Sequence, residues 1–192
     1  MTTIVIAEDE AIIRLDLREL LEEEGYVVVG EAGRGDQAVE LVRQLTPDLV
    51  ILDVKMPGMD GIEAARRITS EGICAVLMLT AFSQREIVEQ ARDAGAVAYL
   101  VKPFQKAELV PAIELATARY AETKALVSEV SELTERLEVR KLLDRAKGLL
   151  IDAHGMKESV AFSFIQKSAM TQRTTMRAIA ESILKGELVP PA

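Results

Sequence analysis

The chain has 192 residues, a formal net charge of −8 and a single cysteine, Cys74. This length can enclose one full α/β core and a small second unit, and one cysteine excludes an internal disulfide. The sequence lacks a signal-peptide pattern, and no apolar run approaches the ~18 residues that span a membrane, so we expect a soluble, cytoplasmic protein.

Five short apolar runs punctuate the first hundred residues, at positions 4–7, 26–29, 49–52, 75–79 and 98–101. The runs are mostly continuous and β-branched, which is typical of strands buried on both faces. The segments between them carry apolar residues at helical spacing, for example Leu17, Leu20 and Leu21. Strand alternating with helix predicts an α/β fold with right-handed crossovers.

Polar residues stand where four of these runs end. Glu8 and Asp9 follow the first run, Asp53 the third, Thr80 the fourth and Lys102 the fifth. Because the carboxyl ends of parallel strands lie at one edge of the sheet, and ligands bind outside that edge, we expect these side chains to converge.

Three converging carboxylates need a cation, since like charges ~4 Å apart cost about 4 kcal/mol at an effective dielectric of ~20. Mg²⁺ suits such a site and leaves an outward-pointing Asp free to act as a nucleophile toward a phosphoryl group. Lys102 and Thr80 can then bind phosphoryl oxygens. Taken singly, each residue could be a helix cap or an ordinary surface group. Their shared position at strand ends favours phosphate chemistry.

Four segments resemble the receiver domain of two-component response regulators: IVIAEDE (4–10), DLVILDVKMPGMDG (48–61), LTA (79–81) and YLVKPF (99–104). The resemblance covers about the first 118 residues. It implies a flavodoxin-like, doubly wound five-stranded parallel sheet in a receiver domain spanning 3–118, with a sensor histidine kinase as partner.

The resemblance also implies roles for individual residues. Asp53 is the phosphoacceptor, assisted by Thr80 and Lys102, and Thr80 and Tyr99 occupy the switch positions. Pro103 follows a peptide bond that is often cis in the family. Mg²⁺ is expected at a set of four residues: Glu8, Asp9, Asp53 and the backbone carbonyl of Lys55. The chain is then a regulatory protein rather than an enzyme, taking part only in its own aspartyl phosphorylation and dephosphorylation.

From residue 106 to about 151 the sequence has hardly a turn signal and predicts a long helix. We expect residues 119–138 to be a connecting helix and a candidate coiled coil. Its stripe of a and d positions is formed by Leu126, Val130, Leu133 and Leu137. Two heptads leave two alternatives open: pairing between chains, as in a homodimer formed on phosphorylation, or packing within one chain.

The charge reverses in the last part of the chain. Residues 139–192 carry nine basic and five acidic side chains, whereas the remainder carries 14 basic and 26 acidic ones. A basic module on an acidic protein suggests a polyanionic partner. Helical periodicity divides this part into helices near 139–153, 157–170 and 174–184, with Thr171 and Thr174 as expected caps around the last turn and His154 at a helix end.

Several segments of this tail resemble the ANTAR domain of transcription antitermination regulators: RAKGLL (145–150), AF (161–162), AM (169–170), QRTTM (172–176) and two later pairs, IA (179–180) and IL (183–184). The resemblance covers most of residues 127–188 and predicts a small all-α domain of three helices. It implies binding to paired RNA stem-loops in nascent transcripts, held in a form that excludes a terminator hairpin.

We expect RNA contacts from Ala146, Lys147, Gly148 and Arg173. Small residues would let RNA approach the helix, and the basic side chains would reach phosphates or base edges. Gly148 weakens a helix by ~1 kcal/mol relative to Ala, so its presence in the predicted helix needs an explanation. The two explanations are close packing of another helix and close approach of a ligand. Phe162 or Phe164 could stack on bases or belong to the core, and the spacing leaves this open.

The sequence thus predicts a phosphorylation-controlled regulator that binds stem-loop RNA and promotes antitermination. Two other functions stay open. The tail could bind DNA, although it shows no helix-turn-helix pattern, or it could dock a protein and make the chain a signalling adaptor.

Overall fold

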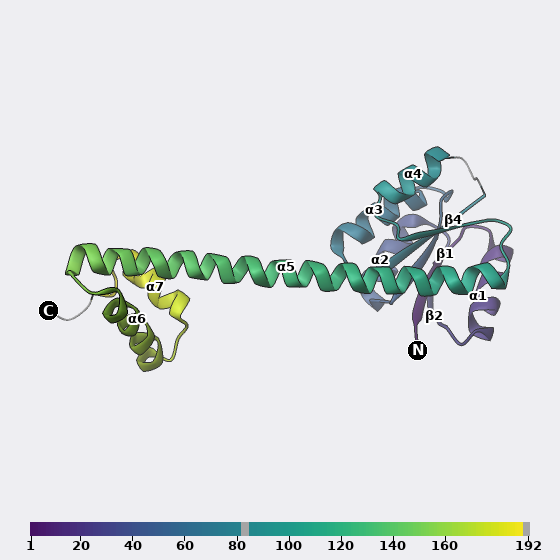
Figure 1. Cartoon of the computed structure of the whole chain (residues 1–192). Helices are drawn as coiled ribbons and strands as arrows, with labels where there is room; N and C mark the ends of the chain where they lie inside the picture. The colour runs from purple at the N-terminus through teal and green to yellow at the C-terminus, as the bar shows by residue number, and fades with distance from the viewer. Residues whose placement is uncertain (82–84, 190–192) are drawn as a thin grey trace. The chain divides into compact units, whose positions relative to one another are not determined.

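The structure is a computed structural model that describes residues 1–81 and 85–189. In this described part, five parallel strands form one sheet in the order β2-β1-β3-β4-β5 (Figure 1). The strands are β1 (Thr3–Ala7), β2 (Val27–Ala32), β3 (Leu49–Asp53), β4 (Ala75–Thr80) and β5 (Ala98–Val101). The five strands predicted from the apolar runs, and the parallel α/β fold, are confirmed.

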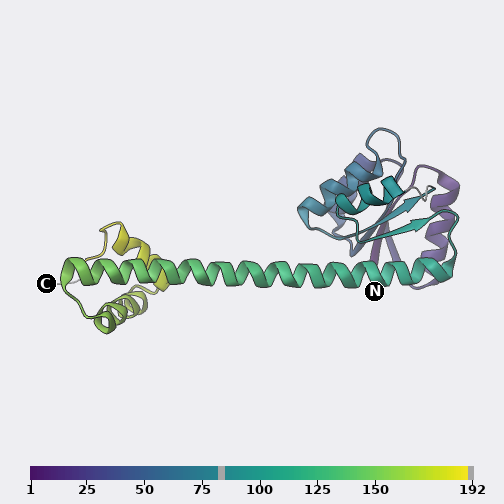
Figure 2. The ribbon, with the colours of Figure 1, turned by 45° about the horizontal axis from the view of Figure 1, so that its top comes forward.

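Helices cover both faces of the sheet, because alternate strand residues point to opposite sides. One core contains Val5, Val50 and Val76, with α2 (Gly35–Leu45), α3 (Gly61–Glu71) and α4 (Arg85–Asp93) packed on it. The other contains their neighbours Ile4, Ile51 and Leu77, under α1 (Ala11–Glu23) and the first part of α5 (Lys106–His154) (Figures 1 and 2).

The start of α3 lies directly against the end of β3. Asp60 caps the helix, its Oδ1 accepting from the backbone N–H of Glu63 at 2.8 Å. A Cβ built on Gly61 would overlap the carbonyl oxygen of Asp53, so only glycine fits there. The Asp60-Gly61 pair therefore fixes the backbone that carries Asp53.

The predicted long helix is confirmed as α5, which runs for 49 residues through Pro111 and ends at His154. Gly155 follows with a positive φ of 63°, the conformation that commonly ends a helix. The chain divides into two compact units, 1–125 (unit 1) and 126–192 (unit 2).

Unit 2 combines the last part of α5 with α6 (Glu158–Gln172) and α7 (Met176–Leu184), as the periodicity predicts. Its core is small and aliphatic: Ala146, Leu150, Ala161, Ile165, Ala169, Ile179, Ala180 and Ile183. The expected caps are wrong. Thr171 lies inside α6, and Thr175 rather than Thr174 caps α7, because its hydroxyl accepts from the N–H of Ala178 at 3.2 Å.

Within the described residues, no helix is both long and apolar enough to cross a membrane.

Candidate functional site: an acidic phosphoryl site and a helical nucleic-acid interface

The strand register brings the predicted polar residues to one edge of the sheet. Asp53 ends β3 and pairs with Leu79, the residue before Thr80, and Thr80 in turn pairs with Val101, the residue before Lys102. Glu8 follows the last residue of β1. The chain therefore places side chains from four strand ends together, as the sequence predicts.

The three carboxylates form one cluster. Glu8, Asp9 and Asp53 each offer an oxygen within 4.8 Å of the others. Glu8 and Asp53 are buried, whereas Asp9 is exposed. A cavity of about 200 Å³ opens beside Asp53, lined also by Asp9, Lys55 and Lys102. The site is thus a small acidic hollow that solvent reaches from the side of Asp9.

Lys102 bridges the two buried acids. Its Nζ lies 2.6 Å from Oδ1 of Asp53 and also contacts Oε2 of Glu8. Burial alone lowers the pKa of Lys102, but the hydrogen bonds and charges of the two acids outweigh it and raise that pKa above its usual value. Lys102 is therefore protonated and holds Asp53 in place.

The other oxygen of Asp53 is also positioned. Its Oδ2 accepts a hydrogen bond of 2.8 Å from the backbone N–H of Lys55. The peptide bond between Lys102 and Pro103 is cis, as the resemblance implies. With one oxygen on an ammonium and the other on a backbone N–H, the Asp53 carboxylate has a fixed orientation.

The charges fit a divalent metal ion. Three carboxylates face one ammonium group, and the pKa of Glu8 is raised, chiefly by burial and also by the charge of Asp53. This excess of negative charge, offered by hard oxygen ligands, is the environment that Mg²⁺ prefers. The residues present therefore fit the expected cofactor.

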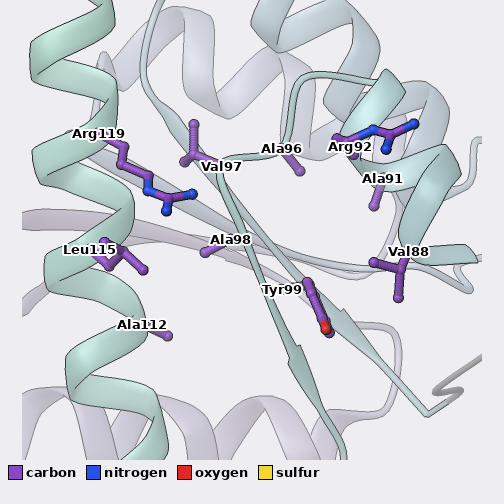
Figure 3. Close-up of a pocket in the computed structure, with 10 residues that line it drawn as sticks. All are labelled: Val88, Ala91, Arg92, Ala96, Val97, Ala98, Tyr99, Ala112, Leu115 and Arg119. Carbon is purple, nitrogen blue, oxygen red and sulfur yellow. The ribbon is translucent and has the colours of Figure 1, made fainter. Parts of the chain in front are cut away.

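The two expected switch residues lie on adjacent strands but in different surroundings. Thr80 is buried beside the acidic cluster, whereas Tyr99 is 51% exposed. Tyr99 extends from β5 between α4 and α5, where a cavity of about 360 Å³ is lined by Val88, Leu115 and Arg119 among others (Figure 3). One expected switch residue therefore lies at the buried site and the other at an open surface of unit 1.

In unit 2 the structure corrects one expected RNA contact. Ala146 is fully buried in the core, four residues before Leu150 on the same side of α5. Its small side chain serves the packing of α6 and α7 against α5, so it does not present a surface to RNA.

Lys147 is close to the surface but already paired. Its Nζ lies 2.9 Å from Oδ1 of Asp144 and 3.0 Å from Oε1 of Glu158. These hydrogen bonds raise the pKa of Lys147. The second contact joins α5 to the first turn of α6, so Lys147 holds two helices together besides carrying charge.

Gly148 and Arg173 remain open to a ligand. No atom from elsewhere in the described chain lies within 4 Å of a Cβ built on Gly148, so packing inside unit 2 does not explain this glycine. Arg173 ends α6 with a φ of 50° and is exposed. Of the two reasons weighed for Gly148, close approach by another molecule fits this geometry.

Sequence reasoning missed Gly61 and Thr175. The Asp60-Gly61 pair reads as a turn, but its close approach to the Asp53 carbonyl appears only in three dimensions. The sequence does contain a signal for Thr175 as the helix cap. Ala178 stands three residues later, where the apolar residues at helical spacing begin.

Two family models match the chain: the response regulator receiver domain over residues 4–114 and the ANTAR domain over residues 131–184. The chain therefore belongs to the response regulators that carry a receiver domain and an ANTAR domain, which are RNA-binding antitermination regulators.

Individual relatives match either nearly the whole chain or only part of it. The chain is 60% identical to the transcriptional regulatory protein PdtaR of Mycobacterium tuberculosis (strain ATCC 25618 / H37Rv) over 182 residues, which cover 95% of this chain and 89% of that protein. It is 40% identical to the chemotaxis protein CheY of Bacillus subtilis over 57% of this chain and 92% of that protein. A solved two-component response regulator of the LuxR family from Aurantimonas sp. SI85-9A1 superposes with a TM-score of 0.58 at 38% identity, covering 62% of this chain and 86% of that one.

Proposed function

We propose that phosphorylation of Asp53 by a sensor histidine kinase controls how tightly the ANTAR domain holds stem-loop RNA. The observation that carries this proposal is the buried Asp53 carboxylate, held by Lys102 and the Lys55 N–H in a cluster with Glu8 and Asp9. Burying charged groups is costly, so a cluster of this kind at a sheet edge is typical of a reactive site.

The transfer step is an in-line displacement. An oxygen of Asp53 attacks the phosphorus of a phosphohistidine, the O–P bond forms as the N–P bond breaks, and the imidazole leaves with the electron pair. Lys102 and the Thr80 hydroxyl lie where they can bind phosphoryl oxygens. Hydrolysis of the acyl phosphate by water returns the carboxylate, so the chain is a regulator that takes part in its own phosphorylation and dephosphorylation.

Mg²⁺ would be held by Asp9, Asp53 and the carbonyl of Lys55, with Glu8 reaching it through water. When bound, it supplies positive charge that offsets both the carboxylates and the incoming phosphoryl group. The chain's own residues orient the nucleophile. Asp9, the exposed member of the cluster, faces the side from which the ion and the phosphoryl donor enter.

Phosphorylation adds roughly two negative charges beside Lys102 and Thr80. Movement of these groups toward the phosphoryl group changes the packing next to β5, and Tyr99 follows from its exposed position between α4 and α5. Because α5 continues from unit 1 into unit 2, this face is the link between the site and the RNA-binding domain.

The output state is a homodimer paired through α5. Leu126, Val130, Leu133 and Leu137 are all at least half exposed, so the core of unit 2 does not use them. Four apolar side chains in a, d spacing with no cover in unit 2 match a second copy of the same helix. Pairing places two ANTAR domains on two adjacent RNA loops, and this bivalency raises affinity.

RNA contacts come from Lys147, Gly148 and Arg173 in this proposal. Gly148 has the open space that close approach needs, and Arg173 is exposed. The protein acts in the cytoplasm, where nascent transcripts are made.

The test uses the full chain with Mg²⁺ and acetyl phosphate, and a labelled RNA carrying two adjacent stem-loops. We expect phosphorylation to tighten binding of this RNA, and the Asp53→Asn variant to show no such change. Duplex DNA of matching length serves as competitor. Equal competition by the duplex would support a DNA-binding regulator, and no RNA binding by the phosphorylated protein would support a protein-docking adaptor instead.

A further inference from the structure

The two phenylalanines of unit 2, its only aromatic residues, have different environments. Phe164 is partly buried and packs against the core of unit 2, whereas Phe162 is 42% exposed and lies outside that core. Phe164 is therefore explained by packing. The exposed ring of Phe162 is not, since an aromatic side chain gains most of its stabilisation by leaving water.

The helical period of α6 lines up further side chains with Phe162. Gln166 and Met170 follow it at intervals of four residues, so these three side chains lie along one side of the helix, and Arg173 is the residue that caps the helix at its C-terminal end. All of them are exposed. The buried residues Ala161, Ile165 and Ala169 lie on the side that faces the core of unit 2. We call the exposed set of Phe162, Gln166, Met170 and Arg173 the α6 platform.

The charge on this platform is positive and unneutralised. From Ser159 to Arg173 the sequence contains no Asp or Glu. The side chains of Lys167 and Arg173 have no ion-pair partner among the residues that the structure describes. Lys147 and Arg177, in contrast, each contact two carboxylates. Within the platform the unpaired cation is Arg173, and other basic residues of unit 2 also lack an ion-pair partner among the described residues, including Arg145, Lys157 and Lys185.

We propose that the α6 platform receives an unpaired base of the RNA loop, which stacks on the ring of Phe162. Gln166 offers both a donor and an acceptor to the edge of that base, and Arg173 binds a flanking phosphate. An exposed aromatic ring, with a free cation at the end of the same helix, suits recognition of single-stranded loops, because bases within a duplex do not expose their faces. This inference rests on the proposed RNA-binding function and assigns it to a particular surface.

The experiment uses the full chain, phosphorylated with acetyl phosphate and Mg²⁺. A library of tandem hairpin RNAs with randomised loops is first selected on the phosphorylated parent protein, and the retained RNA becomes the probe. Phe162→Leu keeps an apolar side chain but removes the ring, and it should weaken binding about 5- to 150-fold. Phe162→Tyr keeps the ring and should bind within about 2-fold of the parent.

Val160→Ala is the matched control, because Val160 is similarly exposed on α6 but lies two residues away, on another side of the helix. It should leave RNA affinity unchanged. Arg173→Gln should make the negative slope of log affinity against log salt less steep by about 0.7, whereas Phe162→Leu should leave that slope unchanged. Circular dichroism should show the same helix content in all variants.

The outcomes separate this inference from the proposed function. If the phosphorylated parent protein retains no RNA, the proposed RNA binding itself fails. If it retains RNA but Phe162→Leu binds that probe as tightly as the parent, the α6 platform is wrong and the function stands. A loss on duplex DNA equal to the loss on the probe would also overturn base stacking, since a duplex offers no unpaired base.

Discussion

The two units hold their polar residues in opposite ways. In the described residues, the buried polar side chains are Glu8, Asp53 and Thr80, and all lie in unit 1 at one edge of the sheet. Unit 2 has a core of aliphatic residues only, and its charged groups lie at the surface. Chemistry on a phosphoryl group needs fixed, desolvated partners, whereas contact with a large polyanion needs exposed ones.

This difference affects how each unit tolerates change. Residues in the acidic cluster share partners, since Lys102 contacts both Glu8 and Asp53, so substitutions there are coupled. Exposed residues of unit 2, such as Phe162 and Arg173, do not contact one another in the structure. Substitutions at these positions should therefore change the free energy of unfolding additively.

Asp53→Asn should abolish phosphorylation by acetyl phosphate or a partner kinase, because the amide matches the carboxylate in shape but is a far poorer nucleophile. Gel mobility in the presence of a phosphate-binding ligand measures the product. Circular dichroism should show an unchanged fold. Labelling of the variant at the parent's level would place the phosphoacceptor at another residue and remove the distinction between a reactive unit 1 and a binding unit 2.

The sequence predicts the site of unit 1 well because strand periodicity and topology are enough to place it. Once the apolar runs are parallel strands, Asp53, Thr80 and Lys102 must lie at the same edge, whatever the details of side-chain packing. What topology cannot give is the environment of each group. Lys102 bridges both buried acids, and Gly61 lies against the Asp53 carbonyl. Both contacts depend on interatomic distances that a sequence pattern does not give.

Unit 2 is harder to predict, because a short motif on a helix contains residues that face different ways. Ala146, Lys147 and Gly148 are consecutive, but helical geometry turns each by about 100° from the last. The structure accordingly buries Ala146, pairs Lys147 with two acids and leaves Gly148 open. The four-residue spacing of Leu142, Ala146 and Leu150 is a sequence signal that indicates a core position for Ala146.

Leu133→Ala should weaken the phosphorylated dimer by about 100-fold, because removing one buried leucine from each of two chains costs about 3 kcal/mol. Sedimentation of the phosphorylated chain measures the monomer–dimer equilibrium. Ser131→Ala, an exposed change two residues away and outside the apolar stripe, is the control. A dimer unaffected by Leu133→Ala would show that α5 does not pair through this stripe.

Asp9→Asn should weaken Mg²⁺ binding by at least about 10-fold, the loss that follows removal of even an outer partner of a metal site. It should also raise the melting temperature of the metal-free protein, because it removes one charge from three mutually repelling carboxylates. Calorimetric titration with Mg²⁺ measures the affinity. Asp16→Asn, at an exposed acid on α1 outside the cluster, provides the control. Equal affinity in Asp9→Asn and the parent would remove Asp9 from the metal site.

The smallest effect concerns two glycines of unit 2 that should respond in opposite directions. Gly148 lies inside α5 with open space around its missing Cβ, so Gly148→Ala should stabilise unit 2 by about 0.5–1 kcal/mol. Gly155 also has open space but a φ of 63°, a conformation that alanine rarely adopts, so Gly155→Ala should destabilise unit 2. Urea unfolding followed by circular dichroism measures both. If Gly148 permits close approach of RNA, Gly148→Ala should also bind the selected stem-loop probe more weakly despite its greater stability. A variant that is more stable and binds RNA as tightly as the parent would show that the glycine is not part of the interface.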